Sequence, residues 1–195
     1  EEFEFYLSDL NAKALIVERG SVSPAIEVAK KLGVRVIDLV ANEAAGDFSL
    51  EPREAAAVAP AANGGAAQAD DVALVLHTSG TTSRPKIVPL TQRNVSASAQ
   101  NIRATLAFTE KDRGLNIMPL FHIHGLIAGI MAPLSAGASV FCTPGFDALK
   151  FFSLMDEAHP TWYTAVPTMH QAILSRASRN KEIIERNPLR FMRSS

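Results

Sequence analysis

The sequence predicts an α/β fold in which a layered, parallel-rich sheet has helices on both faces. Short apolar runs alternate with helix-like segments along most of the chain, and this β-α-β rhythm favours a parallel sheet. The apolar runs are nearly continuous, as expected for strands that are covered on both sides. The 195 residues are 47% hydrophobic and 20% charged, a composition typical of a globular core with a polar surface.

The first group of elements is a βαβ segment over residues 1–42. Ser23 is suited to cap a helix whose first position is Pro24, because the missing N–H of proline would be unpaired there anyway. Gly33 is suited to end that helix. The predicted order is a helix over 1–12, a strand over 14–18, a helix over 23–33 and a strand over 35–40.

Residues 43–71 are predicted to be a connection. They are rich in Ala, Gly, Pro and acidic residues, so they can bury little apolar surface. The pattern supports at most a weak helix around 51–58. We expect the strands on either side of this connection to share one compact unit.

Residues 72–195 resume the alternation of strand and helix. Thr91 is suited to cap the longest helix, because its hydroxyl can accept a hydrogen bond from an unpaired N–H of the first turn. The predicted strands span 72–77, 86–90, 114–118, 138–143, 161–166 and 189–195, and the predicted helices span 92–108, 124–136, 147–158 and 167–178.

Composition argues against several classes of protein. The net charge of −1 argues against a nucleic-acid or membrane-surface protein, because phosphate attraction needs concentrated Lys and Arg. No apolar run approaches the roughly 20 residues of a transmembrane segment. The single cysteine, Cys142, excludes an internal disulfide and fits a reducing compartment. We therefore expect a cytoplasmic protein, while a C-terminal peroxisomal signal would lie outside this sequence.

The loop HTSGTTSRPKI, residues 77–87, is the strongest candidate for a ligand site. It combines several hydroxyl groups with a glycine that lets the backbone approach a ligand and a lysine that supplies positive charge. Successive backbone N–H groups in such a turn can form an anion-binding nest, although a polar hairpin between two strands would have the same composition. The candidate residues for binding the phosphates of ATP are Thr78, Ser79, Gly80, Thr81, Thr82, Ser83, Arg84 and Lys86.

Two common nucleotide-binding motifs do not fit this loop. A Walker A motif, G-x-x-x-x-G-K-[ST], needs a glycine where Pro85 stands and a hydroxyl where Ile87 stands. It would also continue into a helix, whereas a strand is predicted after Lys86. The dinucleotide fingerprint G-x-G-x-x-G does not occur in the sequence.

The order TSGTT-x-x-PK resembles the signature loop of the adenylate-forming superfamily, whose members are acyl-activating, AMP-binding enzymes. That family usually has glycine where this chain has Ser83 and Ile87, but the hydroxyl run and Lys86 are retained. The phrase LHTSGTTSRPKIVPLTQRN, with PLFHIHGL after it, is most similar to acyl-CoA synthetases of the oxalate–CoA ligase type. The resemblance covers nearly the whole chain and implies part of the family's large N-terminal domain.

Two further stretches agree with this resemblance. Residues 116–141 resemble the family's next core motif, which implies a catalytic role for His122, and residues 162–174 resemble an element that walls its active site. From the residues alone, histidines after a strand end suit a ligand site, but a packed, hydrogen-bonded histidine is an alternative. No Cys, Asp or Glu nearby completes a metal site. The resemblance places His124, Gly125, Val166, Pro167 and Thr168 at the acyl pocket.

The resemblance implies an enzyme that uses ATP, Mg²⁺ and CoA to activate a small carboxylic acid as an acyl-adenylate and transfer it to CoA. The family's adenine, ribose and catalytic-lysine segments would follow residue 195, so we expect this excerpt to be inactive by itself. Two alternatives stay open: an adenylating ligase with another acceptor, and a non-catalytic domain of the same fold.

The sequence begins without Met. We expect a longer polypeptide, whose truncation would expose sheet edges that favour association.

Overall fold

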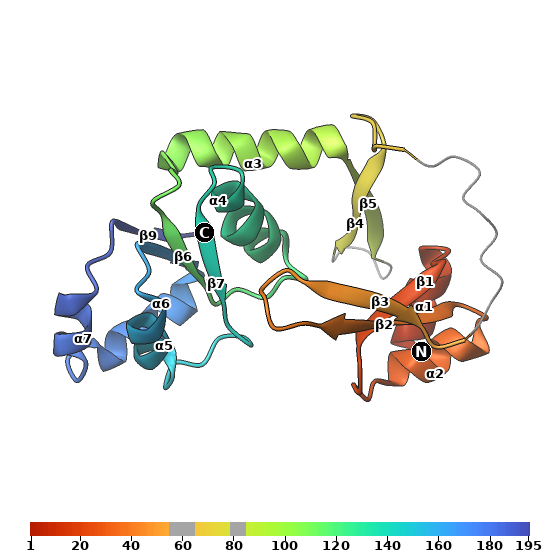
Figure 1. The fold of residues 1–195 in the computed structure, drawn as a ribbon, viewed down its shortest axis with the longest axis horizontal. Helices are drawn as coiled ribbons and strands as arrows, with labels where there is room; N and C mark the ends of the chain where they lie inside the picture. The colour runs from red at the N-terminus through yellow and green to blue at the C-terminus, as the bar shows by residue number, and fades with distance from the viewer. Residues whose placement is uncertain (55–64, 79–84) are drawn as a thin grey trace. The chain divides into compact units, whose positions relative to one another are not determined.

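The computed structural model describes residues 1–54, 65–78 and 85–195. It divides the chain into two compact units, Glu1–Gly64 and Gly65–Ser195 (Figure 1). The expectation that both halves share one unit is therefore wrong. Each unit encloses an apolar cluster of its own, so the hydrophobic effect stabilises each one separately. Among the described helices, none has the length and apolar character needed to cross a membrane.

The first unit is a three-stranded sheet with two helices. Its elements are α1 (Glu2–Asp9), β1 (Ala14–Glu18), α2 (Pro24–Lys31), β2 (Arg35–Ala41) and β3 (Phe48–Pro52). As predicted, β1 and β2 are parallel (Figure 1). Ser23 Oγ caps α2 by accepting a hydrogen bond from the amide of Ala25 at 3.2 Å. Ile26 and Ala29 of α2 then pack against Val36 of β2, which joins the helix to the sheet.

The strand β3 lies within residues 43–71, which were predicted to be a connection. It pairs antiparallel with β2, and all of its residues are exposed, including Phe48 and Leu50 at 50% and 47%. Phe48, Ser49, Leu50 and Glu51 do alternate apolar and polar residues, a strand signal that the sequence reasoning missed in this Ala- and Gly-rich segment. Residues 51 and 52 belong to this strand, so they are not the start of the weak helix expected over 51–58.

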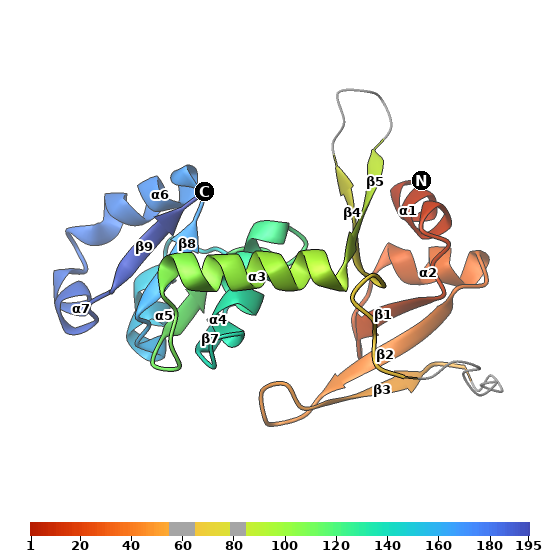
Figure 2. The same cartoon turned by 90° about the horizontal axis from the view of Figure 1, so that it is seen from above.

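The second unit begins with an antiparallel hairpin and a long helix. These elements are β4 (Val72–Thr78), β5 (Lys86–Thr91) and α3 (Gln92–Leu106). The predicted cap is confirmed, because Thr91 Oγ1 accepts a hydrogen bond from the amide of Asn94 at 3.2 Å. The Asn94 side chain accepts one from the amide of Thr91 at 3.0 Å in return. Leu74 and Leu90 pack against Val95, which holds the hairpin at the start of α3 (Figure 2).

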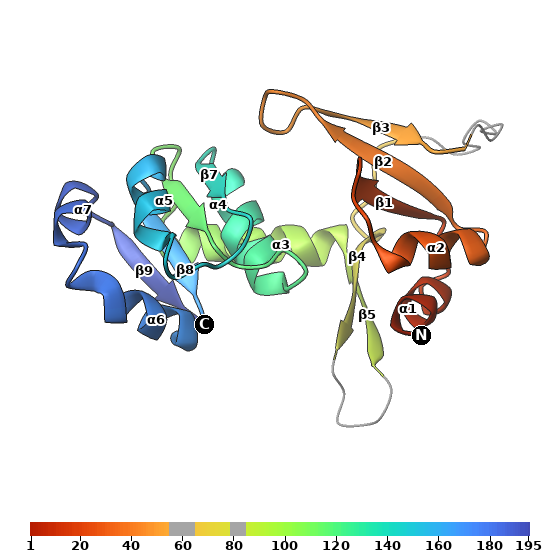
Figure 3. The ribbon, with the colours of Figure 1, turned by 90° about the horizontal axis from the view of Figure 1, so that it is seen from below.

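A four-stranded sheet in the order β7-β6-β8-β9 forms the rest of the second unit, and all of its strand pairs are parallel. Trp162 of β8 packs against Phe108 and Ala132 on the face covered by α3 and α4. Its neighbour Tyr163 packs against Phe151 of α5 on the other face. Figure 3 draws the strands of this sheet and the helices around them. Helices thus cover both faces, which confirms the predicted fold class. The elements are β6 (Arg113–Asn116), η1 (His124–Met131), α4 (Ala132–Leu134), β7 (Ser139–Cys142), α5 (Phe151–Ala158), β8 (Trp162–Ala165), α6 (Pro167–Ala177), α7 (Lys181–Arg186) and β9 (Phe191–Ser194).

Two helices differ from the prediction. The expected α-helix over 124–136 is a π-helix, η1, followed by the short α-helix α4; π-helical turns are frequent at functional sites. The helix α7 has no buried residue, so hydrophobic periodicity does not predict it. A tertiary contact holds α7 against α5, because Arg186 donates two hydrogen bonds of 2.6 Å to the carboxylate of Asp156.

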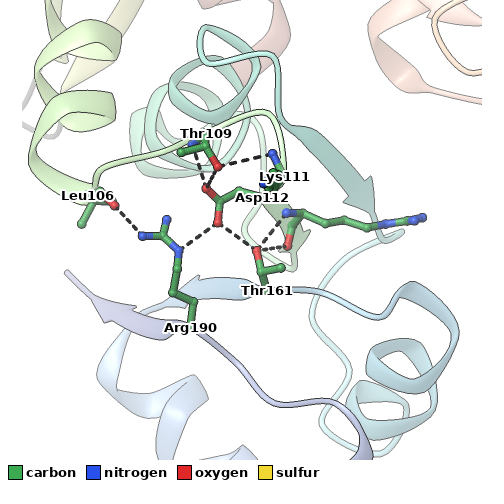
Figure 4. A network of polar contacts seen from close by, with 7 residues as sticks. Leu106, Thr109, Lys111, Asp112, Thr161 and Arg190 are labelled. Atoms are coloured by element: carbon green, nitrogen blue, oxygen red, sulfur yellow. Dashed lines mark hydrogen bonds and ion pairs between the residues drawn. The ribbon is translucent and has the colours of Figure 1, made fainter.

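A buried carboxylate joins the amino ends of three strands of the parallel sheet (Figure 4). Asp112 precedes β6, Thr161 precedes β8 and Arg190 precedes β9. Asp112 Oδ1 accepts hydrogen bonds from Thr161 Oγ1 at 3.1 Å and from Arg190 Nε at 2.9 Å. Its Oδ2 accepts one from the amide of Thr109 at 2.8 Å. Arg190 also donates to the carbonyl of Leu106 at 3.1 Å, so the end of α3 is held by the same network.

The surroundings of Asp112 favour its charged form. Burial raises the pKa of the carboxyl group, but hydrogen bonds from Thr109, Thr161 and Arg190, together with the Arg190 charge, lower the pKa more. The pKa therefore lies below its ordinary value. A carboxyl group of this kind stabilises the fold above its unfolded pKa of about 3.9. That contribution is lost as the pH falls through the folded pKa.

Replacing Asp112 by Asn should lower the free energy of unfolding by about 2 kcal/mol at neutral pH, because hydrogen bonds to a charged group are weakened. The difference should shrink in strong acid, where the wild-type carboxyl group is also neutral. Urea unfolding of the full-length protein, at neutral pH and in strong acid, measures this difference in the free energy of unfolding. Asp70→Asn is the matched control, because its ion pair with Arg93 is exposed and should contribute less than about 0.5 kcal/mol. Equal losses in the two variants would contradict a central role for Asp112.

Candidate functional site

The predicted phosphate loop joins β4 to β5, at the turn end of the hairpin. Thr78 ends β4 and is paired with Lys86, which begins β5. Both residues are exposed, so the hydroxyl of one and the ammonium group of the other are accessible to an anion. The remaining residues predicted to bind phosphate lie outside the described part of the chain: Ser79, Gly80, Thr81, Thr82, Ser83 and Arg84.

His122 lies in the turn that follows β6 and leads to η1. Its amide donates a hydrogen bond to the carbonyl of Pro119 at 3.3 Å, and its ring packs against Phe121 with centroids 4.7 Å apart. Both aromatic residues are exposed. The imidazole is accessible to a ligand at the carboxyl end of β6, and its catalytic role stays a prediction.

Two glycines allow η1 to pack directly against the carboxyl end of β6. A Cβ at Gly125 would lie 2.4 Å from the carbonyl oxygen of Pro119, and a Cβ at Gly129 would lie 2.6 Å from Oδ1 of Asn116. Any larger side chain would therefore push η1 away from the strand. Asn116 is held in place by donating from Nδ2 to the carbonyl of Met118 at 3.1 Å. Packing thus explains why position 125 is a glycine, and its place at the acyl pocket stays a prediction.

Three polar side chains meet where η1 approaches β8 and β9. We call His124, Thr164 and Arg193 the His–Thr–Arg cluster. His124 Nε2 lies 2.7 Å from Thr164 Oγ1 and 3.0 Å from Arg193 Nη1. Thr164 is only 1% exposed and is paired with Arg193 across the parallel strands. The cluster lies toward the carboxyl ends of the strands, the edge at which α/β proteins bind ligands.

The cluster defines the protonation state of His124. A guanidinium group only donates hydrogen bonds, so we assign Nε2 of the neutral ring as an acceptor and the ring proton to Nδ1. Burial lowers the pKa of His124, and the positive charge of Arg193 lowers it further. His124 is therefore a neutral imidazole that presents an N–H donor at Nδ1.

The three residues predicted to wall the acyl pocket follow β8 directly. Val166 is the half-buried N-cap of α6, and Pro167 occupies the first position of the helix. Pro167 and Thr168 are exposed. Because β8 ends just before them, they lie at the same sheet edge as His124. The structure thus brings the predicted pocket residues together at one edge, while their contact with an acid stays a prediction.

Thr164 and Arg193 are site residues that the sequence reasoning did not identify. Each is a polar residue two positions after a buried or half-buried aromatic one, Trp162 or Phe191, and side chains two apart on a strand share a face. This spacing shows only that Thr164 lies on the same face of its strand as Trp162, and Arg193 on the same face as Phe191. The strand register that pairs them comes from tertiary structure.

The opposite face of β8 and β9 borders an apolar cavity of about 480 Å³, whose lining includes Leu174 and Met192. His170 lies at this cavity and donates from Nε2 to the carbonyl of Arg193 at 3.0 Å. Because Nε2 carries the proton, Nδ1 accepts the hydrogen bond from the hydroxyl of Tyr163 at 3.1 Å. His170 thus holds the backbone of Arg193 from the face opposite the His–Thr–Arg cluster.

Comparisons with known proteins by sequence and by structure agree on one family. Residues 1–194 match a family described as AMP-binding enzyme. An oxalate–CoA ligase of Arabidopsis thaliana is 45% identical over 196 residues, which cover 100% of this chain and 38% of that protein. An oxalate–CoA ligase of Saccharomyces cerevisiae is 33% identical over 196 residues, with 90% and 36% covered. The crystal structure of ATP-bound MatB from Rhodopseudomonas palustris has a TM-score of 0.73 at 26% identity, with 99% and 37% covered. The chain spans well under half the length of each relative.

Replacing Arg193 by Gln should raise the pKa of His124 toward its ordinary value of 6.5, because a positive neighbour is removed while burial persists. An NMR titration of the imidazole signals in the full-length protein measures the pKa in both forms. Arg179→Gln is the control, because Arg179 is exposed and outside the cluster. A wild-type pKa at or above 6.5, or an unchanged pKa in Arg193→Gln, would show that the cluster does not form as described.

Proposed function

This chain belongs to the AMP-binding enzyme family, and we propose that the full-length protein is an ATP-dependent acyl-CoA synthetase, an acid–thiol ligase. The main support is the 45% identity, over the whole chain, to an oxalate–CoA ligase. We propose that the chain forms part of a large N-terminal domain. Within it, residues 1–42 are the βαβ segment, 43–71 a connection that includes β3, and 72–195 the part with the phosphate loop and acyl site.

The proposed reaction has two displacement steps. First, a carboxylate oxygen of the acid bonds to the α-phosphorus of ATP, and the bond from this phosphorus to the bridging oxygen of pyrophosphate breaks. Second, the thiolate sulfur of CoA bonds to the acyl carbon, and AMP leaves with the oxygen that joined it to the acyl group. Such reactions depend mainly on positioning and on neutralisation of negative charge.

We assign the β- and γ-phosphates of ATP to the loop between β4 and β5. The exposed Lys86 would offset their charge, and the hydroxyl groups from Thr78 onward would donate hydrogen bonds. Mg²⁺ prefers phosphate oxygens and would supply further positive charge when bound. The residues that the structure describes include no group of three or more His, Cys, Asp or Glu side chains suited to hold a metal ion, and we assign no protein ligand to Mg²⁺.

We assign the acid to the carboxyl edge of the parallel sheet. His122 would act between the nucleotide and the acid, and His124, Gly125 and residues 166–168 would border the acid. The neutral state of His124 matters here, because its Nδ1–H can donate a hydrogen bond to a carboxylate without changing the charge of the site. The buried hydroxyl of Thr164 keeps that imidazole in one orientation.

Pyrophosphate release by the full-length protein, from ATP and a panel of small carboxylic acids, tests this function. Hydroxylamine trapping with and without CoA identifies the acceptor. We expect acyl-adenylate without CoA and a thioester with it. Adenylate without thioester would favour another acceptor, and no adenylate with any acid would favour a non-catalytic domain. Residues 1–195 alone should release no pyrophosphate, because they span well under half the length of the relatives that they match.

Replacing Lys86 by Ala should raise KM for ATP at least about 10-fold and change KM for the acid little, because a charge-assisted hydrogen bond to phosphate is lost. Steady-state kinetics of the full-length enzyme measure both constants. Lys111→Ala is the control, since Lys111 is also exposed but lies beyond α3, away from the hairpin. An unchanged dependence of rate on ATP would show that Lys86 does not face the phosphates.

A further inference from the structure

We propose that Asn116 is a positioning residue for the adenylation reaction and fixes the places of His122 and His124 at the carboxyl edge of the sheet. This inference rests on the proposed function of the two histidines, and it adds a residue that acts through them. Asn116 ends β6 and is only 4% exposed. Asparagine is a mostly exposed residue type, so a buried one calls for an explanation in its contacts.

The amide nitrogen of Asn116 holds the start of the turn that carries His122. Nδ2 donates a hydrogen bond to the carbonyl of Met118 at 3.1 Å. The backbone carbonyl of Asn116 accepts hydrogen bonds from the amide and the hydroxyl of Thr143, at 3.2 and 3.0 Å. The next carbonyl along the turn, that of Pro119, accepts one from the amide of His122 at 3.3 Å. Asn116 thus fixes the chain at the point where it leaves β6 for this turn.

The amide oxygen of Asn116 sets the distance between the sheet and η1. This oxygen faces Gly129, because an oxygen turned toward the Met118 carbonyl would be repelled by it. A Cβ at Gly129 would lie 2.6 Å from the amide oxygen and 3.8 Å from the backbone carbonyl oxygen of His124. The contact therefore lies next to the first residue of the helix, and a change in it displaces the backbone that carries the imidazole.

Strand pairing places Asn116 beside the hydroxyl that contacts His124. Asn116 of β6 is in register with Thr164 of β8, so their side chains lie on the same face of the sheet. Thr164 Oγ1 lies 2.7 Å from His124 Nε2. The helix η1 thus meets the sheet at two neighbouring positions. The imidazole reaches the Thr164 hydroxyl only while Asn116 holds the helix at its present distance.

The amide oxygen of Asn116 has a cost for stability. It is buried and accepts no hydrogen bond from any residue that the structure describes. An unsatisfied buried acceptor costs free energy, and an apolar side chain of similar size can be neutral or stabilising in its place. Native proteins depart from full hydrogen bonding mainly at functional or strained sites. Asn187 is equally buried, but both of its amide atoms have hydrogen-bond partners.

The test replaces Asn116 by Leu in the full-length enzyme. Asn116→Leu should lower kcat about 10- to 100-fold, the effect of a small displacement of catalytic groups. KM for ATP should change little, because Lys86 lies on a separate hairpin. The midpoint of thermal unfolding should also change little, because the unsatisfied oxygen is removed. A residue that served stability alone would show the opposite pattern.

Asn187→Leu is the matched control for the loss of a buried asparagine. The Asn187 amide joins α5 to α7 through Asp156 and the carbonyl of Ile183. Its replacement leaves buried polar groups without partners, so the midpoint of thermal unfolding should fall. The value of kcat, measured where the variant is folded, should stay unchanged. Equal losses of kcat in the two variants would overturn a special role for Asn116.

The pKa of His124 reports the position of its imidazole without turnover. Burial is the main cause that lowers this pKa, so an imidazole that leaves its place should titrate closer to 6.5. An NMR titration of the full-length protein should show this rise in Asn116→Leu and none in Asn187→Leu. An unchanged pKa in Asn116→Leu would overturn the proposal. If the wild-type protein adenylates no acid, the proposed function fails, yet the rise in pKa would still support positioning of His124.

A second variant changes the same contact from the side of η1 and serves where Leu at position 116 prevents folding. Gly129→Ala places a methyl group against the Asn116 amide oxygen, so it should push η1 away from β6. It should lower kcat and raise the pKa of His124, as Asn116→Leu does. Asn116→Ala in the same chain removes that oxygen and should restore part of both values. No recovery of the pKa in the double variant would show that the two residues do not act through one contact, and would overturn the proposal.

Discussion

The carboxylate of Asp112 is the contact on which the second unit depends. It binds Thr161 and Arg190, so the residues that precede β6, β8 and β9 share one charged, hydrogen-bonded centre. Strands that are held together at their amino ends are also held in register at their carboxyl ends. A slip of β9 by one residue would reverse the faces of its side chains. Met192 would then enter the polar cluster, and Arg193 would face the apolar cavity.

Two cationic groups of the second unit are presented differently, and each presentation suits a different anion. Lys86 is exposed at the end of a hairpin, where a flexible point charge can follow phosphates of several geometries. Arg193 is half-buried on a paired strand, with its backbone carbonyl held by His170. A fixed, planar donor set suits one carboxylate in one orientation. Burial lowers the pKa of His124, and the charge of the same Arg193 lowers it further, so Arg193 contributes to both the charge and the hydrogen-bond pattern of the cluster.

Most of the fold could be predicted, because most elements carry a local signal. The strands of the parallel sheet are short apolar runs, and the caps at Ser23 and Thr91 form as their residue types predict. Three elements were not predicted, and only β3 carries a clear local signal, the alternation of apolar and polar residues from Phe48 to Glu51. The strand β3 buries no side chain and α7 buries none, while the π-helical form of η1 accompanies a close approach of Gly125 to the Pro119 carbonyl. Pairing with β2, the ion pair of Arg186 with Asp156 and the close packing at Gly125 accompany these three elements.

The sequence by itself determined the family, the α/β class, the hydroxyl-rich loop that ends in Lys86 and the histidines after β6, because each is a property of neighbouring residues. Only the tertiary structure decided that the chain forms two units and that His124 lies 3.0 Å from Arg193. These two residues are far apart in the chain, and no local pattern connects them. Strand register and the Asp112 network bring them together. The contact between His124 and Arg193 is therefore evident only after folding.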